Sequence, residues 1–159
     1  MATNMSITFE EPNLPERGTI EILSWSHGFT QPTGSRTAGQ ATHQNLSFTK
    51  YLDENTNALM KLMWSGKQFV KATVSCYRGD GARDDKPSLY LTVVMEQVII
   101  ANFSVAGGRG DVPVETVALD YGTVQYNYIE QKRPDEGRPP KAAAPFRAVR
   151  SMKKPAKKK

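Results

Sequence analysis

Residues 43–66, HQNLSFTKYLDENTNALMKLMWSG, decide the fold, because they contain a short strand followed at once by a helix. In the first part, Leu46 and Phe48 alternate with polar residues, which is the period of a ribbon with one dry face. Three later apolar residues have the i, i+3, i+4 spacing that places them on one side of a helix: Leu59, Leu62 and Met63. The stretch therefore predicts a strand and then an amphipathic helix.

The expected helix covers about residues 55–65, or roughly three turns. Before it, Asp53, Asn55 and Thr56 are residue types that accept hydrogen bonds from the free N–H groups of a first turn. After it, Gly66 can take the left-handed conformation that ends a helix. A helix of this length is not stable alone in water, so we expect its apolar side to pack on a sheet.

The rest of the chain has strand patterns separated by polar stretches. The expected strands are residues 6–10, 19–26, 68–77, 88–105, 114–120 and 123–130, and the expected loops are residues 28–42 and 78–87. Residues 88–105 are too long for one ordinary strand, so they form either two strands divided at Glu96 and Gln97 or one strand bent at a bulge. We expect residues 114–120 to pair with residues 123–130 across Tyr121 and Gly122. The sequence predicts a mainly β fold, a two-sheet β-barrel or sandwich with one short α-helix packed against it.

Charge divides the chain near Gln131. The whole chain has 21 Lys and Arg against 16 Asp and Glu, a net charge of +5. Eleven of the basic residues lie in residues 132–159 with only Asp135 and Glu136, so this tail has a charge of +9 and residues 1–131 have −4. The tail also contains five prolines and few apolar residues, so it cannot offset the entropy of ordering itself. We expect one β-barrel domain over residues 1–131 and a basic, disordered tail over residues 132–159.

The residues do not favour an enzyme, a metal site or a cofactor. The single cysteine, Cys76, allows no internal disulfide and falls on the apolar face of an expected strand, where cysteine is a small buried hydrophobe. His27 and His43 have no carboxylate or cysteine at ligand spacing on the same element, so we interpret them as hydrogen-bonding residues rather than metal ligands. No serine lies in the G-x-S-x-G turn of a hydrolase. The Arg-Gly-Asp tripeptides that begin at Arg78 and Arg109 fit polar turns better than recognition motifs.

Two further features concern location and partners. No apolar run approaches about 18 residues, and no basic and then apolar N-terminus is present, so we expect neither a membrane span nor a classical signal peptide. A lysine cluster ends the tail: Lys153, Lys154, Lys157, Lys158 and Lys159. Flexible lysines attract phosphate groups without reading sequence. The cluster therefore allows contact with nucleic acid or another anionic surface, with a solubilising tail as the simpler interpretation.

Five collinear blocks resemble the haemolysin-coregulated protein (Hcp) family of bacterial type VI secretion systems. The blocks are IEILSWSHGFTQP, HQNLSFTKYLDENTNAL, SGKQFVKATVSCYR, LYLTVVMEQVIIANFSV and PVETVALDYGTVQYNY, within residues 18–131. The resemblance implies a helix-capped two-sheet β-barrel similar to phage tail-tube proteins. It also implies hexameric rings that stack into the inner tube of the apparatus, hold effector proteins in the lumen and contact sheath and spike proteins. No catalytic residue is carried over from the family.

The resemblance further implies synthesis in the bacterial cytoplasm and then secretion without a signal peptide. A ring subunit needs partner surfaces on several sides, and the polar loops can supply them. The expected subunit or ring-stacking contacts are Gln31, Arg36, Arg78, Asp84, Asp85 and Arg109. Two alternatives remain: a tube protein of another contractile, phage-tail-like particle, and a binding module whose basic tail contacts an anionic surface.

Overall fold

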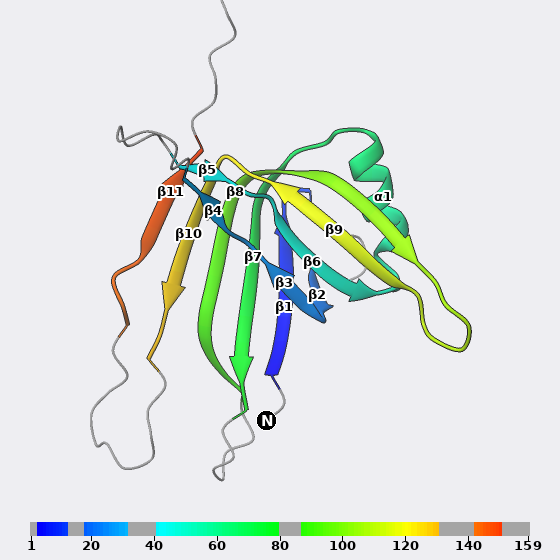
Figure 1. Ribbon diagram of the computed structural model, residues 1–159, viewed down its shortest axis with the longest axis horizontal. Helices are drawn as coiled ribbons and strands as arrows, with labels where there is room; N and C mark the ends of the chain where they lie inside the picture. The colour runs from blue at the N-terminus through cyan, green and yellow to red at the C-terminus, as the bar shows by residue number, and fades with distance from the viewer. Residues whose placement is uncertain (1–2, 13–17, 32–40, 80–86, 131–141, 151–159) are drawn as a thin grey trace, which may run out of the picture.

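The structure is a computed structural model that describes residues 3–12, 18–31, 41–79, 87–130 and 142–150 (Figure 1). The elements before the helix are β1 (Thr3–Glu10), β2 (Thr19–Ile22), β3 (Ser24–Ser26), β4 (Phe29–Thr30), β5 (Thr42–His43) and β6 (Leu46–Tyr51). The helix is α1 (Thr56–Trp64), and the strands after it are β7 (Phe69–Arg78), β8 (Ser88–Ala106), β9 (Val114–Asp120), β10 (Thr123–Tyr128) and β11 (Phe146–Val149). The predicted mainly β fold with one short helix is confirmed.

The longest feature is a two-stranded ribbon that bends in its middle. β8 continues without interruption and pairs with β10 along its first half and with β9 along its second half. The register continues across the bend, since Glu96 opposes Thr123 on one side and Ile99 opposes Asp120 on the other. Two residues separate these pairs on each strand, so the ribbon turns without an inserted residue.

The bend decides between the alternatives for residues 88–105 and corrects a pairing. β8 is one strand that turns at Gln97, where φ is +56°, and its bulge lies further on, between Ile100 and Asn102. The expected hairpin between β9 and β10 is wrong, because the chain runs on through Tyr121 and Gly122 and keeps β8 as its partner. Gly122 leaves room at the bend for the Gln97 side chain, which would have to shift if residue 122 carried a Cβ.

Two sheets share β8 at the bend. Sheet A has the order β2-β1-β7-β8-β10-β11 and uses the first half of β8, whereas sheet B has the order β8-β9-β6-β3 and uses the second half. The expected single strand 19–26 is divided at Leu23 into β2, which pairs with β1, and β3, which pairs with β6. The described strands therefore form a sandwich joined at two corners rather than a closed barrel.

Helix α1 forms where the sequence predicts it and covers one end of the sandwich (Figure 1). Leu59 is fully buried, and Leu62 and Met63 pack against the core. The helix ends at Trp64, and Gly66 follows the C-cap residue with a φ of +64° and donates its N–H to the Met63 carbonyl at 3.0 Å. The apolar side of a short helix is thus buried as expected.

A buried ion pair that the sequence analysis missed lies under the start of α1. Lys50 of β6 and Glu115 of β9 oppose each other in register, and both side chains are 0% exposed. The Lys50 ammonium also lies 2.9 Å from the Asp53 carboxylate and donates to Oγ1 of Thr56 at 3.4 Å. We call these four residues the charged corner. It connects the first turn of α1 to two strands of sheet B, while the N-cap residue Asn55 makes no side-chain capping bond.

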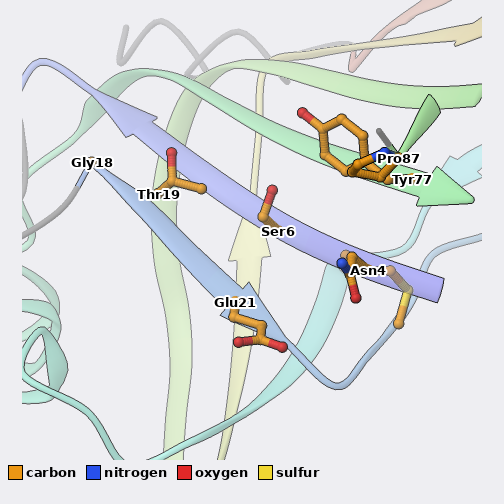
Figure 2. Close-up of a pocket in the computed structure, with 8 residues that line it drawn as sticks. Asn4, Ser6, Gly18, Thr19, Glu21, Tyr77 and Pro87 are labelled. Carbon is orange, nitrogen blue, oxygen red and sulfur yellow. The ribbon is translucent and has the colours of Figure 1, made fainter. Parts of the chain in front are cut away.

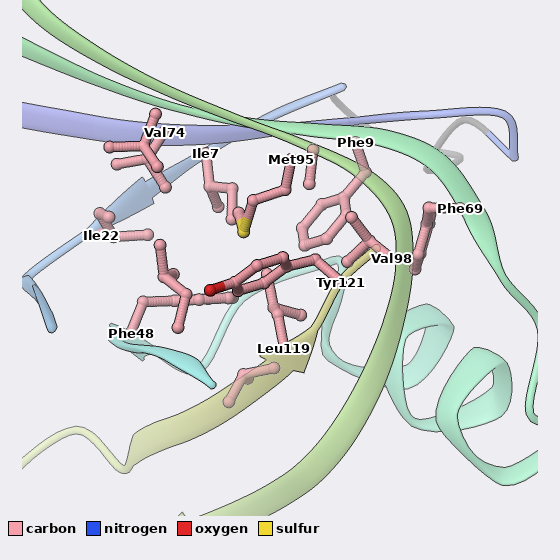
Figure 3. Close-up of a cluster of buried hydrophobic side chains, with 14 of the residues drawn as sticks. Ile7, Phe9, Ile22, Phe48, Phe69, Val74, Met95, Val98, Leu119 and Tyr121 are labelled. Carbon is pink, nitrogen blue, oxygen red and sulfur yellow. The ribbon is translucent and has the colours of Figure 1, made fainter. Parts of the chain in front are cut away.

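The hydrophobic core fills the space between the two sheets (Figure 3). Phe9 and Phe69 pack with ring centroids 4.6 Å apart, and Phe48 closes the sheet B side of the same group. Cys76 is buried on β7 as predicted, and burial raises the pKa of its thiol. Tyr121, at the bend of the ribbon, is 2% exposed and extends into this core.

The C-terminal region differs from the predicted disordered tail over residues 142–150. β11 pairs with β10, with Tyr126 opposite Phe146 and Thr123 opposite Val149, and Ala142 bridges to Ile129. The alternation of Phe146 and Ala148 with Arg147 and Val149 supplies a strand pattern that the prolines on either side obscure. Residues 131–141 and 151–159 lie outside the described ranges.

Candidate assembly surface

Sheet B has two lateral edges that lack a strand partner among the described residues. β9 and β6 pair on both sides, but β3 pairs only with β6, and β8 beyond Val98 pairs only with β9. Free main-chain N–H and C=O groups along such edges favour pairing with another chain. Ile99 and Val105 on the β8 edge are also 40% and 47% exposed. The edges of sheet B are therefore the candidate surface for assembly.

The outer face of sheet B is covered mostly by small, uncharged side chains. Buried residues such as Phe48 and Val117 point into the core, so their neighbours in each strand point outward. The outward positions across the register are Ser24, Ser26, Ser47, Thr49, Tyr51, Ile99, Asn102, Ser104, Ala106, Val114, Thr116, Ala118 and Asp120. Ser24 and Thr49 share a hydroxyl hydrogen bond of 2.6 Å. This face offers hydroxyl groups and little charge to whatever lies against it.

Three of the six predicted contact residues are described, and they lie in different parts of the molecule. Gln31 follows β4, Arg78 ends β7 and Arg109 lies in the turn between β8 and β9 (Figure 1). The guanidinium of Arg78 lies 5.5 Å from the centre of the Tyr90 ring. Arg36, Asp84, Asp85 and the tail lysines Lys153, Lys154, Lys157, Lys158 and Lys159 lie outside the described residues. A contact role for these residues stays a prediction.

A shallow groove of about 710 Å³ crosses the outer face of sheet A over β1, β2 and β7 (Figure 2). Its described lining is mainly neutral, with hydroxyl groups from Ser6 and Thr19, the Tyr77 ring and one carboxylate, Glu21. This set contains no nucleophile beside a base.

His27 and His43 meet in a hydrogen-bonded cluster at the bend of the ribbon. Both ring nitrogens of His27 bond to phenols, Nδ1 to Tyr126 and Nε2 to Tyr121. Nδ1 of His43 bonds to the same Tyr121 hydroxyl at 3.0 Å. We call these four residues the histidine corner. The interpretation of both histidines as hydrogen-bonding residues is confirmed, but the two tyrosines were not foreseen.

One proton arrangement satisfies the histidine corner with neutral rings. Tyr121 donates to the Gln44 carbonyl at 3.4 Å, so its oxygen accepts from Nε2–H of His27 and from Nδ1–H of His43. Nδ1 of His27 then accepts from the Tyr126 hydroxyl. Burial lowers the pKa of His27, with a further contribution from His43, and burial lowers the pKa of His43, with a further contribution from Arg150. Burial also raises the pKa of Tyr121 and of Tyr126, so all four groups are neutral near pH 7.

The described ranges contain neither a candidate metal site nor a candidate membrane-spanning helix. No group of three or more His, Cys, Asp or Glu side chains is placed to hold a metal ion in that part of the chain. No helix there has both the length and the apolar character needed to cross a membrane.

Comparison with known proteins identifies the family. Residues 10–128 match the family model described as type VI secretion system effector, Hcp. Protein hcp1 of Pseudomonas aeruginosa is 34% identical over 90 residues, which cover 56% of this chain and 54% of that protein. The chain thus spans about half the length of this curated relative.

Solved structures show the same fold. A structure of a type six secretion system protein has a TM-score of 0.77 at 19% identity, covering 93% of this chain and 96% of that one. Hcp1 from Salmonella typhimurium has a TM-score of 0.68 at 24% identity, covering 92% and 94%. Together with the match over residues 10–128, this agreement means that the chain belongs to the Hcp family of type VI secretion proteins.

Proposed function

We propose that the chain is a tube subunit that assembles into closed rings through the two open edges of sheet B. The observation that carries the proposal is that, within the described ranges, β3 and the second half of β8 each lack a strand partner on one side while β6 and β9 do not. Pairing one copy's β8 edge with the next copy's β3 edge extends sheet B by four strands for each copy. A closed ring removes the edges that would otherwise promote aggregation.

Six copies per ring, stacking of rings, contact with sheath and spike proteins and carriage of effectors follow from the family resemblance and belong to the same proposal. In such a ring the outer face of sheet B would line one continuous wall. Its hydroxyl-rich, weakly charged surface would let different cargo proteins approach without a fixed charge preference. Export of the subunit itself through the apparatus is part of the proposal.

The first test is the native mass of the purified chain by light scattering, with negative-stain imaging of the same sample. Rings with a mass near six chains support the proposal, and a monomer at all concentrations contradicts it. Proline at Ser104 and at Val105, in separate variants, then tests the edge. Because N–H directions alternate along a strand, one of the two prolines removes an N–H that points away from β9 and leaves the β8–β9 ladder intact. That variant is expected to stay folded and lose the ring.

The alternative function, contact of the tail with an anionic surface, needs a deletion that spares sheet A. Residues 142–150 contain β11, so the deletion should begin after Arg150 rather than at residue 132. Removal of residues 151–159 is expected to weaken binding to polyanions and to leave ring assembly unchanged. Loss of rings from this deletion would assign the tail to the architecture instead.

A further inference from the structure

β11 is the outermost strand of sheet A and has few attachments. It pairs with β10 over four register positions, and Phe146, Arg147 and Val149 are all more than half exposed. An edge strand of four residues adds little free energy by pairing alone. Ala148 packs against the core and the Arg147 guanidinium lies 3.7 Å from the Glu96 carboxylate, and the other contacts of β11 are made at its ends.

Both ends of β11 are attached beside the histidine corner. At the C-terminal end, the N–H of Arg150 donates to the Gly122 carbonyl at 2.8 Å, and its guanidinium pairs with Asp120. At the N-terminal end, the Phe146 ring lies 5.9 Å from Phe29 and 6.4 Å from Tyr126, measured between centroids. Figure 1 shows β4, β5, β10 and β11 gathered in this region.

The same rings connect β11 to the histidines. Phe29 contacts both His27 and His43, with centroids 4.9 and 5.1 Å apart. Tyr126 stacks on His27 with ring centroids 5.8 Å apart, and its ring also contacts the Phe146 ring of β11. Every ring that holds β11 thus touches a histidine.

The charges facing the histidines are unfavourable to protonation. His27 and His43 face each other through Tyr121, and Arg150, the residue after β11, already places a positive charge near His43. The described titratable groups that contact the pair are Tyr121 at the bend and Tyr126 from β10, and Arg150, just after β11, supplies the positive charge near His43. The Arg150 guanidinium is itself paired with the carboxylate of Asp120.

We propose that the histidine corner is an acid-sensitive clasp that holds β11 on sheet A near neutral pH and releases it in mildly acidic solution. Protonation of His27 converts Nδ1 from an acceptor into a donor, so the Tyr126 hydroxyl must turn its hydrogen away and accept instead, and the ring becomes a cation in the half-buried space between Phe29 and Tyr126. Protonation of His43 places a second cation beside Arg150, and Asp120 cannot neutralise both. Either event weakens the contacts at one end of β11.

The direction of the effect follows from linkage. The docked corner holds both pKa values below the ordinary histidine value of 6.5, whereas release of β11 exposes the corner to water and returns them toward it. The released form therefore binds more protons, and lowering the pH below about 6.5 favours release.

Hydrogen exchange of the full chain, followed by mass spectrometry at about pH 7.5 and about pH 5, tests the clasp. After correction for the intrinsic pH dependence of exchange, the segment 146–149 is expected to exchange several-fold faster at the lower pH. The segment 69–78 of β7, which pairs on both sides, serves as the internal reference and is expected to be unchanged. Equal exchange of residues 146–149 at both pH values overturns the proposal.

The matched variant is H27Q/H43Q, which removes the only two histidines in the chain. Glutamine keeps a donor and an acceptor but does not titrate in this range, so the pH effect on β11 should disappear. The same pH effect in this variant assigns it to carboxylates and overturns the proposal. If the double variant does not fold, H43Q alone is compared with R150Q. The clasp predicts that H43Q shows a smaller pH effect on β11 than the parent chain. It also predicts that β11 exchanges quickly at both pH values in R150Q. An undiminished pH effect in H43Q together with slow exchange of β11 in R150Q contradicts the proposal.

Discussion

The two polar corners of this fold solve the problem of buried polar groups in opposite ways. The charged corner buries a full ion pair, Lys50 with Glu115, at 0% exposure under α1. The histidine corner instead joins neutral rings through phenol hydroxyls and is only partly buried. A buried ion pair is costly to break from one side, whereas a neutral histidine network changes state within one or two pH units of neutrality. One corner therefore fixes the fold and the other makes part of it responsive.

The largest expected effect comes from removing one partner of the ion pair. Glu115→Leu leaves the Lys50 ammonium buried with only Asp53 as an acidic partner, so the free energy of unfolding should fall by about 3–5 kcal/mol. The double variant Lys50→Met with Glu115→Leu should recover most of that loss, since apolar residues of similar size fill the space. Urea unfolding of the single and double variants measures both. If the free energy of unfolding of Glu115→Leu lies within about 1 kcal/mol of that of the parent, the pair contributes no more than an exposed salt bridge does.

A smaller effect is expected at the centre of the histidine corner. Tyr121→Phe keeps the buried ring but removes the hydroxyl to which His27 and His43 donate, so stability should fall by about 1–3 kcal/mol. Tyr77→Phe, on the outer face of sheet A, is the control and should change stability by less than about 0.5 kcal/mol. An equal loss of stability in Tyr121→Phe and Tyr77→Phe would contradict a special role for the Tyr121 hydroxyl.

The pH dependence of global stability distinguishes the corners more finely. Burial holds the pKa of both histidines below the ordinary value of 6.5, so the unfolded chain binds more protons as the pH falls below that value. The free energy of unfolding should therefore decrease from neutral pH toward pH 5, and H27Q/H43Q should flatten this part of the curve. Denaturant midpoints at several pH values provide the measurement. A decrease of the same size in both proteins would trace it to other groups.

The smallest effect is expected on the exposed side of α1. Trp64 is 92% exposed although it lies on the helix that covers the charged corner. Trp64→Ala should change the free energy of unfolding by less than about 0.5 kcal/mol, since it removes no buried contact. A larger loss in thermal unfolding would show that the outer side of α1 also supports the corner.

The sequence predicted those parts of the fold whose signals are local. The helical spacing of Leu59, Leu62 and Met63 and the position of Gly66 were sufficient to place α1 within one residue at each end. The two-residue link at Tyr121 and Gly122 was misread as a hairpin turn, because a short polar break looks the same whether the chain reverses or bends. The length of β8, 19 residues, contained the missing information, since one strand of that length can pair with both β9 and β10.

The two corners were harder to foresee for a physical reason. Lys50 is an even number of residues from Leu46 and Phe48, so its side chain points to the same buried face of the strand. That position signals a buried charge, but its partner Glu115 is far away in the sequence. His27, His43 and Tyr121 likewise belong to three separate segments. Their meeting depends on the bend of the ribbon, and no local pattern encodes that. The edges of sheet B became visible only with the pairing of the strands.

The bent ribbon also has a mechanical consequence. β8 and the continuous run of β9 and β10 are held to each other by main-chain hydrogen bonds on both sides of the bend, with no inserted residue between Glu96 and Ile99. A load applied at the turn between β8 and β9 is therefore carried along unbroken backbone from sheet B into sheet A and is resisted by both ladders in shear. We therefore expect the ribbon to transmit force between the two sheets without a hinge at its middle.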